Sequence, residues 1–146
     1  MVSFLIAYAT YSGNTQEVAE LIQETFVSRQ VDVTLHRIGS GSIPDLANFG
    51  GMIVGSFTWE KGATPEEVKD FVLDVGYKPA HVYVFGTGDT QFGGDALFCQ
   101  AAVKLAEFYH SMYPPLKIEQ SPRGTQEPEV VKWAEGVLEH WLHLHA

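Results

Sequence analysis

The chain has 146 residues, a length typical of one domain, and 45% of them are hydrophobic, as a packed core requires. Nine Lys and Arg stand against eighteen Asp and Glu, and the net charge of −9 argues against nucleic acids and anionic membranes as partners. A single cysteine excludes a disulfide within the chain, and the N-terminus lacks the basic stretch of a signal peptide, so we expect a cytoplasmic protein.

Short apolar runs alternate along the chain with segments whose apolar residues recur at helical spacing. In chain order this pattern predicts strands at 2–8, 31–38, 50–57, 81–88 and 116–120 and helices at about 14–28, 65–75, 96–113 and 127–144, with a looser stretch at 44–49. The first, third and fourth strands are apolar at nearly every position, as strands covered on both faces need to be. We therefore predict a single α/β domain over 1–146, a doubly wound parallel sheet with helices on both faces.

The loops after the first, third and fourth strands should meet at one edge, because ligands of such sheets bind beyond the carboxyl ends of the strands. The first loop reads "ATYSGNT" and places hydroxyls, an amide and Gly13 at the start of a helix, where free N–H groups favour an anion. It holds no Lys or Arg, and the nearest one along the chain is Arg29. This loop predicts a phosphate site built from neutral donors, with ordinary helix capping by Ser12 or Asn14 as the alternative.

The other two loops each carry an aromatic residue, Trp59 in "SFTWEKGATP" and Phe92 in "TGDTQFGGD". A ring on a polar loop usually stacks on something, although each ring could also cap the core locally. Together with the phosphate loop, the rings predict a flat aromatic heterocycle that carries a monophosphate. The fingerprints of P-loop NTPases and of dinucleotide-binding Rossmann domains are absent from the sequence, so we expect neither site.

These three loops, in this order and spacing, make the whole chain resemble the short-chain flavodoxins. "TYSGNT" is similar to the family's phosphate loop, "GSFTWEKG" to the loop that places a Trp against one flavin face, and "GTGDTQFGGDALFCQAAVKL" to the segment that holds the other face and the pyrimidine edge. The resemblance implies a five-stranded sheet of order 2-1-3-4-5, non-covalent FMN, and a low-potential one-electron carrier that is not an enzyme. It also implies, as partners, a flavodoxin or ferredoxin reductase and acceptor enzymes with basic surfaces, and we expect a monomer.

The resemblance assigns the cofactor-binding residues by position. The first loop would hold the phosphate, Trp59 would stack on the inner ring face, Phe92 on the outer face in place of the usual Tyr, and backbone groups of the fourth strand's end would bind the pyrimidine edge. The full set is Thr10, Tyr11, Ser12, Gly13, Asn14, Thr15, Phe57, Thr58, Trp59, Glu60, Lys61, Thr87, Gly88, Asp89, Phe92, Gly93 and Cys99.

Three departures from the family pattern lie in these loops. Glu60 stands where the family commonly has Gly, and a Glu at positive φ costs about 1 kcal/mol, so we expect a weaker flip of the peptide that accepts from the flavin N5–H. Lys61 stands where relatives tend to be acidic, and a cation there would favour the fully reduced flavin by about 2–3 kcal/mol before screening. The loop around Phe92 is longer than in the shorter relatives.

Two other functions fit the same pattern less well. A flavodoxin-like FMN activator of ribonucleotide reductase typically has a Gly-rich loop without the Trp. A non-flavin regulatory domain of the same topology needs acidic residues after the first strand and an Asp after the third, where this chain has "YATYSG" and "GSFTW". His140, His143 and His145 form no recognisable metal-ligand pattern, so we expect no metal site and a frayed, exposed helix end.

Overall fold

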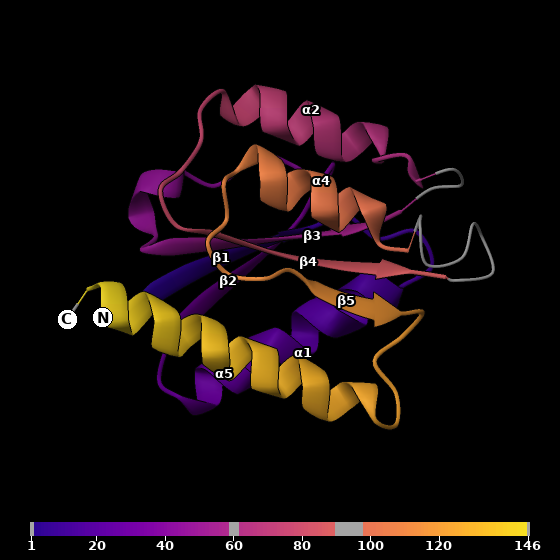
Figure 1. Cartoon of the computed structure of the whole chain (residues 1–146). Helices are drawn as coiled ribbons and strands as arrows, with labels where there is room; N and C mark the ends of the chain where they lie inside the picture. Colours follow the sequence, from indigo (N-terminus) through magenta and orange to yellow (C-terminus); the bar gives the residue numbers. More distant parts are fainter. Residues whose placement is uncertain (1, 59–61, 90–97, 146) are drawn as a thin grey trace.

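A computed structural model describes residues 2–58, 62–89 and 98–145 of the chain (Figure 1). Strands and helices alternate as predicted. In chain order the elements are β1 (Ser3–Tyr8), α1 (Asn14–Ser28), β2 (Asp32–Arg37), the 3₁₀ turn η1 (Leu46–Asn48), β3 (Gly51–Phe57), α2 (Glu66–Val75), β4 (Val82–Gly88), α4 (Gln100–Phe108), β5 (Leu116–Glu119) and α5 (Gln126–Leu144).

The five strands form one parallel sheet of order β2-β1-β3-β4-β5, which confirms the predicted topology. The strand order reverses beside β1, because β2 pairs with one edge of β1 and β3 with the other. The chain therefore leaves β1 and β3 in opposite directions across the sheet. In open sheets of this kind, ligands bind beyond the carboxyl ends of the strands at such a reversal.

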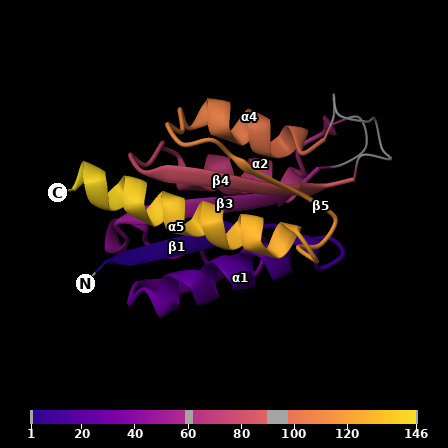
Figure 2. The ribbon, with the colours of Figure 1, turned by 60° about the horizontal axis from the view of Figure 1, so that its bottom comes forward.

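Helices cover both faces of the sheet, with α1 and α5 on one face and α2 and α4 on the other (Figures 1 and 2). Alternate residues of β1 serve the two sides: Phe4, Ile6 and Tyr8 pack with α1 and α5, whereas Leu5 and Ala7 pack with α2 and α4. All five are buried, which explains why the first strand is apolar at consecutive positions rather than alternating with polar residues.

Glycines in β3 make room for the aromatic rings of neighbouring strands. A Cβ on Gly51 would lie 2.5 Å from the Phe4 ring, and one on Gly55 would lie 2.0 Å from Cζ of Phe85. Both rings are fully buried, so neither can move into solvent to relieve such a clash. The small residues of "GGMIVGSF" are thus a packing requirement of the sheet centre.

The helix predicted over 96–113 is wrong in its extent. Residues 96 and 97 lie outside the described part of the chain, Cys99 has a left-handed φ of 53°, and α4 begins only at Gln100. The helix ends at Phe108, and His110 turns the chain with a φ of 52°. Prolines 114 and 115 exclude a continuation, although Tyr109 still packs on the core and so prolongs the apolar pattern.

The C-terminal histidines are also more ordered than predicted. Helix α5 continues to Leu144, and Nδ1 of His140 lies 2.9 Å from the Tyr83 hydroxyl. The ring of His145 stacks on Trp141 with centroids 3.9 Å apart. The bond to Tyr83 ties α5 to the sheet, so the helix end is not frayed, but residues 142–145 are exposed, as predicted. None of the described helices is long and apolar enough to cross a membrane.

Candidate functional site

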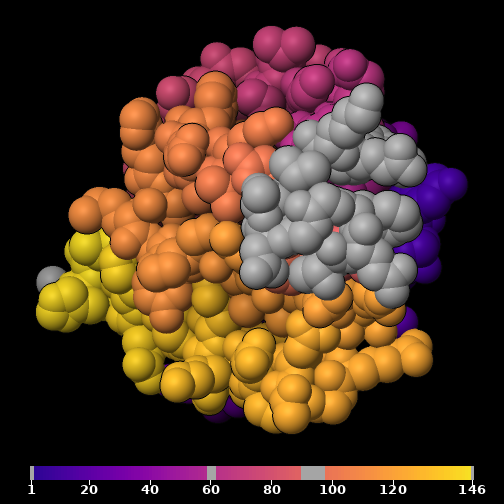
Figure 3. All heavy atoms as spheres, turned by 45° about the vertical axis from the view of Figure 1, so that its right-hand side comes forward, coloured from indigo at the N-terminus to yellow at the C-terminus, as the bar shows by residue number. Residues whose placement is uncertain are grey.

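The carboxyl ends of β1, β3 and β4 and the loops that follow them gather at one edge of the sheet, as the sequence predicts. The arrows of β4 and β5 point to this edge in Figure 1, and Figure 3 turns it toward the viewer. Its described part consists of residues 9–13, 58 and 62–65, and 87–89 with 98–99. Trp59, Glu60, Lys61, Phe92 and Gly93 lie outside the described residues.

The first loop ends at Gly13, which is the N-cap of α1 with a φ of 95°. Its N–H donates to Oγ1 of Thr10 at 3.0 Å, and no side chain caps the helix, so neither Ser12 nor Asn14 plays the capping role considered above. The first intrahelical bond runs from the N–H of Glu17 to the Gly13 carbonyl. The N–H groups of residues 14–16 therefore have no acceptor within the helix, which is the arrangement that binds anions.

A buried pair of hydroxyls joins this loop to the end of β4. Oγ1 of Thr15 and Oγ1 of Thr87 lie 2.7 Å apart, and the two residues are 1% and 2% exposed. Only one of the two hydroxyl hydrogens is used in this bond, so the other can donate to a further acceptor. The pair thus fixes the start of α1 against the sheet and leaves a donor at the same place.

The first loop itself exposes an aromatic ring, which lies near the end of β3. The ring of Tyr11 is 74% exposed and its centroid lies 6.1 Å from that of Phe57, the last residue of β3. Phe57 itself is buried. The next residue, Thr58, is half-buried and accepts a hydrogen bond from the N–H of Ala101 in α4 at 3.1 Å.

The end of β4 touches the start of α4. A Cβ on Gly88 would lie 3.0 Å from the backbone nitrogen of Cys99 and 3.3 Å from its Sγ, so glycine permits the close approach of these segments. Burial raises the pKa of the Cys99 thiol to about 12, and the thiol donates weakly to the Ile118 carbonyl at 3.8 Å. Cys99 is therefore a packed, protonated residue, as predicted. The Asp89 carboxylate accepts from Nε2 of Gln120, which follows β5.

Strand pairing brings a cation closer to the loop than the sequence alone indicates. Arg29 lies at the far end of the 15-residue helix α1, about 22 Å from its start, and pairs with Glu135 at 3.2 Å. Arg37, however, is in register with Tyr8, two residues before Thr10. It follows Val33 and Leu35, which face α1, so strand alternation places Arg37 on the same side. Only the pairing of β2 with β1 could have revealed this.

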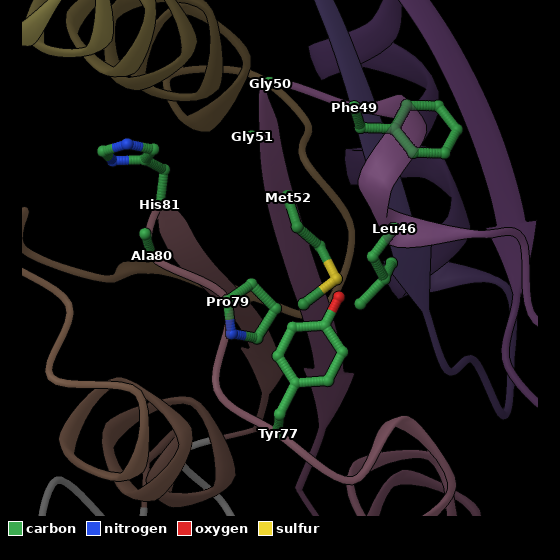
Figure 4. A pocket seen from close by; sticks show the side chains of 9 residues that line it. All are labelled: Leu46, Phe49, Gly50, Gly51, Met52, Tyr77, Pro79, Ala80 and His81. Carbon is green, nitrogen blue, oxygen red and sulfur yellow. The ribbon is translucent and has the colours of Figure 1, made fainter.

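A separate pocket of about 220 Å³ lies at the opposite edge, near the amino ends of β3 and β4. In Figure 4 the side chains of Leu46, Met52 and Tyr77 point toward one another across it. Burial, and then the neighbouring His145 and His140, lower the pKa of His81 at its rim. The pocket has none of the loop features described above and is remote from the predicted site.

Known proteins with similar sequences show which family this chain resembles. The family model for flavodoxin matches residues 6–113. A protein of Bacillus subtilis described as "Probable flavodoxin 2" is 31% identical over 144 residues, which cover 91% of this chain and 92% of that protein.

Solved structures agree with the match in sequence. Oxidised flavodoxin 2 from Bacillus cereus is 31% identical and superposes with a TM-score of 0.84, covering 95% of this chain and 99% of its own. A short-chain flavodoxin associated with a PDU bacterial microcompartment is 26% identical and superposes with a TM-score of 0.86, covering 97% and 99%. The similarity therefore extends over 92–99% of the length of these relatives, and the range matched by the family model spans the positions of all three loops in the sequence.

Proposed function

This chain belongs to the flavodoxin family, whose members are FMN-binding electron-transfer proteins, and we propose that it carries single electrons at low potential from a reductase to acceptor redox proteins. FMN, when bound, supplies reversible one-electron chemistry that needs no substrate turnover by the protein. The contribution of the chain is to bind the phosphate, orient the ring and set the charge around it.

The phosphate would be held by the first loop. Gly13 turns the chain so that three N–H groups of α1 point out of the helix start, and Thr10, Ser12, Asn14 and Thr15 add neutral donors around them. A Cβ on Gly13 would meet nothing within 4 Å, so the loop is open on that side. The three N–H groups at the start of α1 that have no acceptor within the helix are the observation that carries the proposal, because their chemistry fits a phosphate dianion.

The ring would lie between the second and third loops. We propose that its pyrimidine edge is bound by backbone groups of Thr87, Gly88, Asp89 and Cys99. The backbone of Cys99 is favoured over its thiol, since the Sγ is already directed at the Ile118 carbonyl. The proposal for the ring faces adds Tyr11, Phe57 and Thr58 and, from the sequence alone, Trp59, Glu60, Lys61, Phe92 and Gly93.

The charge of the site would help to keep the potential low. A phosphate bound by neutral donors retains its negative charge, which opposes further negative charge on the reduced ring. The chain's net charge of −9 acts in the same direction over a longer range, although salt screens it. The same acidic surface supports docking to partners with basic patches, such as a flavodoxin or ferredoxin reductase. We propose a cytoplasmic monomer.

The proposal is tested by titrating the apoprotein with FMN and with riboflavin, which has the same ring but no phosphate. We expect FMN to bind far more tightly and the loaded protein to accept electrons from a flavodoxin reductase in two one-electron steps during a spectroscopic redox titration. Equal affinities for the two flavins would refute the phosphate site. A loaded protein that no such reductase reduces would refute the role as its electron carrier.

A further inference from the structure

A groove with a volume of about 330 Å³ lies between α2 and α4, the two helices that share one face of the sheet (Figures 1 and 2). We call it the α2–α4 groove, and its main lining residues are Val68, Lys69 and Leu73 from α2 and Lys104, Leu105 and Phe108 from α4. None of these residues belongs to the proposed flavin site. A function of this groove would therefore be additional to cofactor binding.

Apolar side chains form both the floor and the walls of the groove. Val68 is fully buried and Leu105 is 5% exposed, so these two residues close the groove toward the core. Leu73 on α2 is 76% exposed and Phe108 on α4 is 41% exposed. Single exposed apolar residues are common on protein surfaces, but two large ones on the two sides of one apolar groove form a continuous patch of the kind that binds a partner.

Positive charge surrounds the groove, although the chain as a whole is acidic. Lys69 and Lys104 line it, and Nζ of Lys78 lies 4.3 Å from the centroid of the Phe108 ring. Three of the nine Lys and Arg residues therefore gather here, and the described residues that line the groove include no Asp or Glu. The groove is thus locally basic on a chain whose net charge is −9.

The two lysines that line the groove have only weak or neutral partners within the described part of the chain. Nζ of Lys69 lies 4.0 Å from the Glu66 carboxylate, but the two side chains are 55% and 81% exposed, and exposed pairs of this kind contribute little. Lys104 donates to the neutral carbonyl of Gly62 at 3.0 Å. The acidic Glu107 of α4 lines a separate pocket. An acidic partner can therefore pair with these lysines without breaking a strong interaction.

An apolar groove flanked by lysines is complementary to an amphipathic helix with acidic residues beside its apolar stripe. Such helices bind in apolar grooves through residues at i, i+3, i+4 and i+7. A small ligand fits less well, because small-molecule sites enclose most of their ligand, whereas Leu73 and Phe108 stand exposed. We propose that the α2–α4 groove is a docking site for an acidic amphipathic helix of a partner protein. Leu73 and Phe108 pack against its apolar stripe, and Lys69, Lys78 and Lys104 pair with its carboxylates.

This docking site goes beyond the electron-carrier function and does not depend on FMN. The acidic surface elsewhere on the chain favours partners with basic patches, whereas the α2–α4 groove selects acidic ones. The chain thus offers two surfaces of opposite charge, and each disfavours the partners of the other through like-charge repulsion.

Model peptides of about 16 residues test the groove on the whole 146-residue chain. The first peptide has Leu at i, i+3, i+4 and i+7 and Glu on both sides of this stripe. The second has Lys in place of each Glu, and the third has the composition of the first with its Leu residues scattered over all helix faces. Fluorescence anisotropy gives the dissociation constants, and amide chemical shifts locate the contact. We expect the first peptide to bind at least about tenfold more tightly than the others and to shift amides of α2 and α4.

A charge-reversal variant tests the role of the lysines. Lys69→Glu/Lys78→Glu replaces two attractions with two repulsions and should weaken binding of the first peptide about tenfold. Lys117→Glu/Lys132→Glu is the matched control, because it makes the same change in net charge at exposed positions on β5 and α5. The control should stay within about threefold of the wild type.

A second pair of variants tests the apolar wall. Leu73→Gln should weaken binding of the first peptide about 3- to 10-fold. Leu142→Gln is the matched control, because Leu142 is 43% exposed on α5, and it should leave binding unchanged. Both leucines are exposed, so neither change removes a core residue, and the urea midpoint of unfolding checks that each variant is folded.

Four results would overturn the docking site. Equal binding of the first two peptides, or unchanged binding in Lys69→Glu/Lys78→Glu, would exclude recognition by charge. If dodecanoate shifts the amides of α2 and α4 and the first peptide does not, the groove binds a small amphiphile. If sedimentation shows a dimer that Leu73→Gln dissociates, the occupant is a second copy of this chain. A protein that binds the first peptide as expected but binds no FMN would overturn the proposed function alone.

Discussion

The buried contact between Thr15 and Thr87 allows a test of both stability and cofactor binding. Valine has nearly the shape of threonine, so Thr15→Val and Thr87→Val remove one hydroxyl each without opening a cavity. The two residues are 72 positions apart in the chain, and their contact joins the start of α1 to the end of β4. A change in their coupling therefore reports on tertiary structure at the proposed site.

The expected loss of stability follows from the burial of the two hydroxyls. Each single variant leaves the remaining hydroxyl without its partner at a position that is 1% or 2% exposed. Stranding a buried polar group costs about 1–3 kcal/mol, whereas replacing both partners with apolar groups of the same shape is nearly neutral. We therefore expect each single variant to lower the free energy of unfolding by about 1–3 kcal/mol and the double variant to lower it by less than either one.

The assay is urea unfolding of the four apoproteins, followed by titration with FMN and riboflavin. If Thr15 donates to the phosphate as proposed, Thr15→Val should also weaken FMN binding about 10- to 100-fold, because it removes a hydrogen bond to a charged group, and leave riboflavin binding nearly unchanged. Thr87→Val should lower stability with a smaller loss of FMN affinity, since the hydroxyl of Thr15 remains. Additive stability losses in the double variant would refute the buried pair. Equal weakening of both flavins by Thr15→Val would refute its role at the phosphate.

Three further predictions concern the scaffold. Gly13→Ala should lower the free energy of unfolding by about 1–2 kcal/mol through backbone strain alone, and Gly13→Asn by less; equal losses in urea unfolding would contradict this. Gly55→Ala should cost about 1–3 kcal/mol because its Cβ meets the Phe85 ring at 2.0 Å, and a thermal midpoint equal to wild type would refute the packing account. The Cys99 pKa is raised from 9.0 to about 12, so the thiol ionises first in the unfolded chain and stability should fall between these pH values. At pH 10 the free energy of unfolding should be about 1 kcal/mol lower than at pH 8. Cys99→Ala should remove the loss of stability that begins near pH 9, below the pH at which tyrosines ionise. A pH profile of stability that this variant leaves unchanged would exclude Cys99 as the source of that loss.

Local patterns in the sequence were enough to predict much of the fold. The limits predicted for α1 are those observed, Asn14–Ser28, because apolar spacing and the preceding glycine agree on them. The prediction for α4 was wrong because Tyr109 continues the apolar pattern from a turn that is not helical. A pattern of burial indicates which residues face the core, but it cannot by itself distinguish a helix from a turn that packs equally well.

For the site, too, features that depend on local sequence were predictable, and contacts between distant residues were not. The loops at the carboxyl edge were predictable, since alternating strands and helices leave few topologies open. The contacts between Thr15 and Thr87 and between Thr58 and Ala101 were not, because they join residues 72 and 43 positions apart. Side-chain hydrogen bonds at this separation depend on the register of β3 and β4, which only the assembled sheet fixes.

The absence of a cation from the first loop has a physical explanation once the sheet is assembled. Arg29 is engaged with Glu135 at the far end of α1 and is too distant to offset a phosphate charge. Arg37 lies on the α1 side of an edge strand and is exposed to solvent, where an interaction over about 10 Å is worth only a few tenths of a kcal/mol. Binding would therefore depend on the number of N–H and O–H donors at the start of α1, and the phosphate charge would remain available to act on the ring. The loop would thus bind FMN less tightly than a loop with a lysine could. In return, the negative charge of the bound phosphate would disfavour the fully reduced flavin, as a low-potential carrier requires.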